Sequence, residues 1–178
     1  MADRKVEKAQ ADFMGARSQK PKDGTAGVGV YEAAFEVDLG GNVTISTTDN
    51  GLIKTVATVP ANCTVLDAAL ITSEAFDSDD EKGMDLVISN TTPAAADTAM
   101  TATAQLVTAF EAKSSSNGAL GQGQGLVGNP NFVDGGAGTH LCLINTDGSN
   151  AADAIQTGKL VVYIKYIGTA APVANTDV

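Results

Sequence analysis

Short apolar runs separated by turn residues fill most of this 178-residue chain, and they restrict it to an all-β fold. Many of the runs are rich in Val, Ile, Thr and Tyr, residues that suit a pleated, half-buried surface. Strands are predicted at residues 28–39, 43–47, 52–59, 63–72, 84–89, 139–145 and 159–167. Seven or more short strands with turns between them predict an antiparallel β-sandwich or barrel.

The last of these runs is the clearest strand. Leu160, Val162 and Ile164 alternate with Val161 and Tyr163, so both faces of the strand are largely apolar. A strand that is apolar on both faces is buried on both sides. We therefore expect this C-terminal strand in the middle of a sheet.

Two segments predict other local structures. The Asn50-Gly51 pair lies between two of the runs and predicts a tight hairpin turn, because a type I′ turn needs positive φ at both central residues. Residues 94–113 depart from the strand pattern, since they are rich in Ala and carry Phe110 after a candidate N-cap at Asp97. This segment favours one short helix.

Charge divides the chain into a predicted N-terminal arm, residues 1–27, and a predicted body, residues 28–178. Six of the 11 Lys and Arg lie in the first 22 residues with only three acids, which gives that segment a charge of +3. The rest of the chain holds five basic and 18 acidic side chains and carries −13, so the net charge of the whole chain is −10. A cationic arm on an acidic body suggests a protein that anchors itself by its tail; a solvated, frayed terminus is the alternative. The candidate anchoring residues are Arg4, Lys5, Lys8, Phe13, Met14, Arg17, Lys20 and Lys22.

The same charges exclude some partners. An acidic body repels nucleic acid and anionic lipid, because phosphate binding needs clustered Lys and Arg. No segment approaches the roughly 18 apolar residues that a membrane span requires, and no apolar run follows Met1. We expect neither a nucleic-acid nor a membrane partner, and we expect synthesis in a cytoplasm.

Three patterns resemble functional motifs. Residues 123–128 match the dinucleotide fingerprint letter for letter, but Ser and Gly precede them and Asn129-Pro130 follows, where that chemistry needs a strand and a helix. A flexible loop is favoured, and no cofactor is expected. The acidic stretch from Asp77 to Asp85 lacks the Gly and Glu that an EF-hand calcium loop places sixth and twelfth. A solvated acidic turn is therefore favoured over a cation site.

His140 and Cys142 form the third pattern, because residues two apart on a strand share one face. Two ligands do not make a zinc site, so a structural histidine near a sheet edge is favoured and no metal is expected. Cys63 and Cys142 each lie in an apolar run and are expected as buried thiols, with a disulfide between them left open.

No catalytic residue is predicted, and the chain is not expected to be an enzyme. Any all-β fold with 21 acidic residues could bring two carboxylates together for glycoside hydrolysis. Sugar-binding sites, however, normally contain aromatic side chains against which the sugar ring packs. This chain has no Trp, three Tyr and five Phe. Residues 114–138 form its longest breaker-rich tract, which is expected to be either functional or ordered by a neighbour.

Residues 59–70, with the pattern Pro60-Ala61-x-x-x-Val65-x-x-Ala68, resemble structural proteins of tailed-bacteriophage virions, as do the strand at 84–88 and the closing run 157–167. The likeness covers about residues 43–168 and departs in the acidic turn and the arm. It implies a capsid decoration (cement) protein of the phage head: a jelly-roll-like antiparallel β-sandwich on the outer capsid surface, whose arm clasps the major capsid protein. It also implies a homo-oligomer, for which we expect a trimer before a dimer, assembled in the host cytoplasm. A head-fibre or receptor- or glycan-binding adhesion module, using the tract 114–138, is the alternative.

Overall fold

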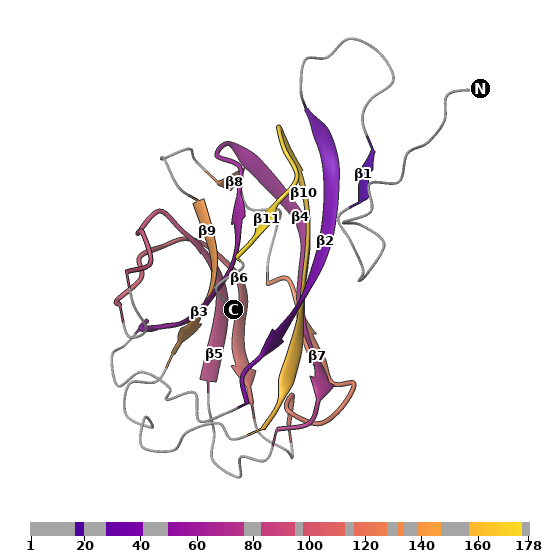
Figure 1. Ribbon diagram of the computed structural model, residues 1–178, viewed down its shortest axis with the longest axis vertical. Helices are drawn as coiled ribbons and strands as arrows, with labels where there is room; N and C mark the ends of the chain where they lie inside the picture. The colour runs from indigo at the N-terminus through magenta and orange to yellow at the C-terminus, as the bar shows by residue number, and fades with distance from the viewer. Residues whose placement is uncertain are drawn as a thin grey trace, which may run out of the picture.

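The computed structural model is an all-β sandwich of two antiparallel sheets (Figure 1). It describes residues 17–19, 28–40, 50–76, 83–94, 98–112, 116–127, 132–133, 139–146 and 157–175. The strands are β1 (Arg17–Gln19), β2 (Gly29–Asp38), β3 (Leu52–Val59), β4 (Cys63–Glu74), β5 (Gly83–Ser89), β6 (Ala102–Glu111), β7 (Gly123–Gly125), β8 (Phe132–Val133), β9 (Thr139–Asn145), β10 (Lys159–Gly168) and β11 (Val173–Ala174). The β10 sheet has the order β1-β2-β10-β4-β7, with β8 also on β4, and the β9 sheet has the order β11-β3-β9-β5-β6.

Eight of the strands are paired in a nested way. The first, β2, pairs with the last, β10; β3 pairs with β9, β4 with β7 and β5 with β6. Successive pairs alternate between the β10 sheet and the β9 sheet. Nested pairs wrapped around one core give two four-stranded sheets, which is the jelly-roll arrangement. The jelly-roll-like β-sandwich is thus confirmed.

Six of the seven predicted strands are confirmed as β2, β3, β4, β5, β9 and β10, with ends that agree within two residues. The seventh, 43–47, lies outside the described residues, as does the partner strand of the predicted hairpin. Asn50 has a positive φ of 58°, but Gly51 is not among the described glycines with positive φ, so the type I′ turn, which needs positive φ at both residues, is not confirmed.

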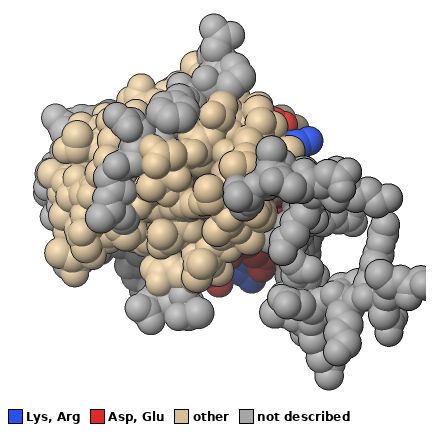
Figure 2. All heavy atoms as spheres, turned by 90° about the horizontal axis from the view of Figure 1, so that it is seen from above, with Lys and Arg blue, Asp and Glu red and all other residues tan. Residues whose placement is uncertain are grey.

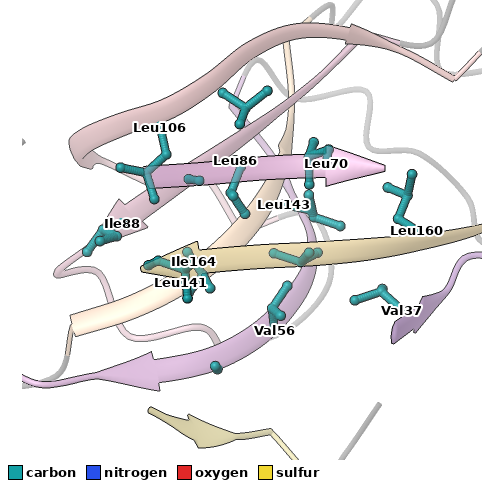
Figure 3. Close-up of a cluster of buried hydrophobic side chains, with 14 of the residues drawn as sticks. Val37, Val56, Leu70, Leu86, Ile88, Leu106, Leu141, Leu143, Leu160 and Ile164 are labelled. Atoms are coloured by element: carbon teal, nitrogen blue, oxygen red, sulfur yellow. The ribbon is translucent and has the colours of Figure 1, made fainter. Parts of the chain in front are cut away.

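The main core lies between the two sheets. Figure 3 shows apolar side chains from both sheets meeting there, among them Leu70 and Leu160 from the β10 sheet and Leu86 and Leu141 from the β9 sheet. The predicted central position of the C-terminal strand is confirmed, because β10 lies between β2 and β4. Its inward residues Leu160, Val162, Ile164 and Tyr166 are fully buried.

The predicted helix within 94–113 is wrong, because this segment contains β6, which pairs with β5 along the margin of the β9 sheet. Pairing with β5 buries Leu106 and Phe110 in the main core and gives β5 its second neighbour. β-Branched Thr103 and Thr108 weaken the competing helix. Tertiary burial outweighed the helical pattern.

The connection from β5 to β6 folds over the outer face of the β9 sheet. Met100 donates its backbone N–H to the Asn50 carbonyl oxygen (3.0 Å), and Leu52 donates to the Thr98 carbonyl oxygen (2.9 Å). A second, smaller core lies beneath this connection and consists of Leu52, Val87, Met100, Cys142 and Ile144. Apolar residues on both faces of β9 are therefore buried, one set in each core.

Candidate interaction surfaces

Of the eight residues proposed for the arm, the structure describes only Arg17, and only its backbone. It lies in β1, which pairs antiparallel with the first part of β2: Arg17 is opposite Glu32 and Gln19 is opposite Val30. The other seven arm residues lie outside the described part of the chain. Arg17 to Gln19 therefore form an edge strand of the body, beside the N-terminal half of β2 (Figure 1).

The described carboxylates gather on the β10 sheet. Five of the seven Asp and Glu residues whose side chains are described belong to it: Glu32, Glu36, Asp38, Asp67 and Glu74. Two lysines lie among them: Lys165 is opposite both Glu32 and Asp67, and the Lys159 Nζ lies 3.2 Å from Glu74 and 3.9 Å from Asp38. The sheet that contains β1 thus carries most of the described carboxylates.

Tyr163 lies near Glu32 and Asp67 of this acidic surface. Its partial burial, and secondarily the charge of Glu32, raises the pKa of its phenol to about 12. The end of the molecule at which β2 begins is different, because most of the described surface there is uncharged and the few visible charged side chains lie along one margin (Figure 2). Val28 and Ile167, 42% and 38% exposed, lie at this end, since Gly29 pairs with Gly168.

A groove follows the edge of β2 beyond β1. It has a volume of about 380 Å³ and lies between the last part of β2 and the edge of the β9 sheet; its lining residues are Ala34, Phe35, Glu36, Val37, Val56, Ala174 and Asn175. Phe35 lines it and is only half-buried, although its inward-facing neighbours Ala33 and Val37 are 3% and 1% exposed. We call this feature the edge groove.

His140 lines a second, larger hollow of about 560 Å³ on the outer face of the β9 sheet. Lys54, Thr58 and Pro93 also line it, together with Val173 of the edge strand β11. β9 lies between β3 and β5, so the predicted placement of His140 near a sheet edge is wrong. Burial lowers the pKa of its imidazole, which favours the neutral form at pH 7. We call this feature the outer hollow.

The two cysteines are buried free thiols, as predicted, and they do not form a disulfide. Cys63 belongs to the main core and Cys142 to the second core on the other face of the β9 sheet. Burial raises the pKa of Cys63 to about 11 and that of Cys142 to about 12. Within the described ranges, no three His, Cys, Asp or Glu residues are grouped so as to hold a metal ion.

The glycines of the fingerprint-like run have a packing role in the strand that they form. Gly123–Gly125 is β7 and pairs antiparallel with β4, so the predicted flexible loop is wrong for these three residues. A Cβ on Gly123 would lie 2.6 Å from the Leu70 carbonyl oxygen, so only glycine allows this close approach. Gly128 lies outside the described residues.

The first half of the tract 114–138 is ordered by its own chain. The Phe76 N–H donates to the Gly118 carbonyl oxygen (3.0 Å), and the Val127 N–H donates to the Leu106 carbonyl oxygen (2.9 Å). Gln124 donates from Nε2 to the Thr108 carbonyl oxygen at 2.6 Å. These bonds tie residues 116–127 to β4 and β6 and their flanking residues without a neighbouring molecule.

Asp85 is the acidic residue whose role sequence analysis missed. Asp77 to Lys82 lie outside the described part, but Asp85 is only 5% exposed and its Oδ1 accepts a hydrogen bond from the Ala109 N–H (2.8 Å). Its signal in the sequence is a carboxylate flanked by apolar Met84 and Leu86 inside a strand. Asp85 therefore has a structural bond, and the described residues do not place it in a cation site.

Comparisons with known proteins returned little. No family model and no curated protein matches the chain. One solved structure, described as the cyanophage Pam1 capsid asymmetric unit, is similar with a TM-score of 0.47 and 20% sequence identity, over 85% of this chain and 92% of that one. In the described part of the chain, no helix has the length and apolar character that crossing a membrane would need.

Proposed function

We propose that this chain is a virion structural protein, a decoration (cement) protein that binds the outer surface of a phage capsid. The observation that carries the proposal is the separation of charge between the first 22 residues, which carry +3, and the remainder of the chain, which carries −13. The sequence resemblance to phage head proteins points the same way, and a jelly-roll body is a fold that virion proteins use.

The proposed mechanism is adhesive. Arg4, Lys5 and Lys8 are attracted to an acidic patch of the major capsid protein, and Phe13 and Met14 bury apolar area on it. Binding that favours the assembled shell stabilises it by mass action against the pressure of packaged DNA. The acidic β10 sheet repels that DNA, which suits a position outside the shell.

We also propose that the protein is a homo-oligomer, a trimer before a dimer. Val28 and Ile167 are exposed apolar residues at the weakly charged end of the body, and such a patch suits contact between copies. Light scattering at micromolar concentration tests this, with Ile167→Asp expected to dissociate the oligomer. A monomer mass for the unmodified chain would remove the oligomer from the proposal.

The test of the main proposal is binding to purified capsid shells that lack this chain. Deleting residues 1–16 leaves β1 in place, so the body should keep its thermal unfolding. Binding should fall by at least about 100-fold, because the two buried apolar anchors are together worth about 3 kcal/mol or more. Replacing Arg4, Lys5 and Lys8 by Ser should give a smaller loss and a weaker salt dependence. Lys165→Ser, on the body, is the matched control. Undiminished binding of the truncated chain would place the anchor in the body.

The outer hollow favours one alternative, a head-fibre or glycan-binding adhesion module. Lys54, Thr58 and His140 offer polar groups beside apolar Pro93 and Val173, a mixture that a small polar ligand can use. Binding of the isolated protein to a glycan array, lost in Lys54→Ala and kept after deletion of the arm, would favour this alternative over capsid binding.

A further inference from the structure

The outer hollow differs in charge from the β10 sheet. Lys54 and His140 line it, and no described Asp or Glu does. The whole chain carries −10, and five of the seven Asp and Glu residues whose side chains are described belong to the β10 sheet. A concave site that holds a lysine and no described carboxylate is suited to an anion.

A row of side chains crosses the hollow. Thr58 of β3 lies opposite Val173 of β11 on one side and opposite His140 of β9 on the other. Residues directly opposite one another on neighbouring strands share a face, with Cβ atoms about 5 Å apart. The Thr58 hydroxyl and the His140 imidazole are therefore neighbours, and the apolar Val173 lies beside them.

Lys54 lies in an irregular part of β3. The pairing of β3 with β9 shifts register between Leu52 and Lys54 and again between Thr55 and Ala57. A β-bulge re-aims the side chains beside it and is common next to functional sites. Here consecutive Lys54 and Thr55 both line the hollow, whereas consecutive residues of a regular strand face opposite sides.

The charge of Lys54 is available to a ligand. Within the described ranges Lys54 forms no ion pair, whereas the Lys159 Nζ lies 3.2 Å from the Glu74 carboxylate. Burial favours neutral His140, and a neutral imidazole offers one N–H donor and one acceptor. The described lining therefore combines one positive charge with neutral hydrogen-bonding groups.

We propose that the outer hollow binds a uronic acid, a sugar unit that carries one carboxylate. The Lys54 ammonium group pairs with the carboxylate, while the Thr58 hydroxyl and the His140 imidazole form hydrogen bonds with hydroxyl groups of the sugar. One positive charge matches a monoanion better than a phosphate, which carries nearly two negative charges. The volume of about 560 Å³ is typical of small-molecule sites and far exceeds what a bare ion fills.

This ligand agrees with the scarcity of aromatic side chains in the chain. Neutral sugars are normally held by aromatic rings that pack against the sugar. In the outer hollow an ion pair supplies the main attraction, and Pro93 and Val173 supply apolar contact.

The inference goes beyond capsid decoration, and it gives the adhesion alternative a ligand class. It rests on the outer hollow alone and involves neither the arm nor a capsid. Deleting residues 1–16 should therefore leave uronic acid binding unchanged, and substitutions in the hollow should leave capsid binding unchanged. Failure of one proposal is thus distinguishable from failure of the other.

Titration of the full chain with glucuronate, followed by NMR, tests the inference. The chain has one histidine, so the ring signals of His140 identify binding in the hollow. Glucose is the matched ligand, because it has a CH₂OH group where glucuronate has the carboxylate. Glucuronate is expected to shift the His140 signals saturably and to bind at least about tenfold more tightly than glucose. Acetate, which has the carboxylate without the sugar, should also bind at least about tenfold more weakly than glucuronate.

Substitutions of Lys54 test its role. Lys54→Gln removes the charge and should weaken glucuronate binding at least about tenfold while leaving the affinity for glucose unchanged. Lys54→Arg keeps the charge and should retain most of the binding. Lys165→Gln, on the β10 sheet, is the matched control and should bind glucuronate as the natural protein does. Thermal unfolding shows whether each variant is folded.

Four results would overturn the proposal. Equal affinity for glucuronate and glucose, or binding of neither, would show that the hollow does not recognise the carboxylate. Equal affinity for acetate and glucuronate would show that it does not recognise the sugar. Undiminished binding by Lys54→Gln would show that Lys54 does not pair with the ligand. His140 signals that shift with protein concentration alone would show that a second copy covers the hollow.

Discussion

Asp85 holds the backbone of Ala109 in a left-handed conformation: its Oδ1 accepts the Ala109 N–H at 2.8 Å, and Ala109 has a φ of 54°. Between the pairs Met84–Phe110 and Leu86–Val107, β5 advances by two residues and β6 by three. The extra residue makes a β-bulge, and a non-glycine residue with positive φ is strained. A buried carboxylate thus stabilises a strained backbone at the margin of the β9 sheet.

Ala109→Gly is expected to stabilise the protein by about 0.5–1 kcal/mol, because glycine adopts positive φ without the Cβ penalty. Urea unfolding measures the change. Ala104→Gly in the same strand is the control: Ala104 is buried and not among the positive-φ residues, so this substitution should be destabilising. A loss of stability in Ala109→Gly would show that the bulge does not strain the backbone.

Asp85→Asn tests the charge at this site. Burial raises the pKa of Asp85 above its ordinary value, so the folded state binds its proton more tightly than the unfolded state. The stability that Asp85 contributes is therefore greatest at low pH and is lost as pH rises through the folded pKa. Asn keeps a hydrogen-bond acceptor and does not titrate. The stability of the variant relative to the natural protein should rise from about pH 3 towards pH 7.

Urea unfolding of both proteins across this pH range measures that difference. Asp85→Ala, which leaves the Ala109 N–H without this acceptor, should cost about 1–3 kcal/mol near pH 3, and the cost should shrink towards pH 7 because Ala, like Asn, does not titrate. A difference between Asn and Asp that stays flat or falls with pH would mean that burial does not govern this carboxyl group.

Gly123→Ala is expected to destabilise the protein by about 1–3 kcal/mol, because its Cβ would lie 2.6 Å from the Leu70 carbonyl oxygen and force β7 away from β4. Gly125→Ala is the matched control in the same strand, since its Cβ would come no closer than 3.9 Å to any neighbour. Thermal unfolding of the two variants compares them. Equal melting temperatures would show that β7 can shift without cost.

Val162→Asp is expected to cost several kcal/mol and to threaten the fold, because it buries an unpaired carboxylate in the central strand β10. Val161→Asp, on the outer face of the same strand and only half-buried, should be tolerated far better. Circular dichroism on heating measures both. Similar behaviour of the two variants would contradict the inward orientation of Val162.

The arm and its neighbourhood show how far sequence analysis reaches towards the candidate site. The charge distribution distinguishes the N-terminal segment from the rest of the chain. The pairing of Arg17 with Glu32, 15 positions apart, depends on the backbone register of β1 and β2, which composition does not predict. The edge groove likewise combines β2, Val56 and Asn175, which are far apart in the chain. No local sequence pattern predicts a groove formed by residues so far apart.

The sequence by itself determined the fold class and most of the strands, because short apolar runs rich in β-branched residues and the turn residues between them are local signals, as in β3, β9 and β10. Only the tertiary structure decided the state of β6 and β7. Leu106 and Phe110 suit a helix or a strand, and the burial available beside β5 selected the strand. Gly123 and Gly125 have no side chains, so no apolar pattern predicts a strand there. They form β7 because their backbone pairs closely with β4. Where local preference is weak, long-range packing supplies the free energy that decides the conformation.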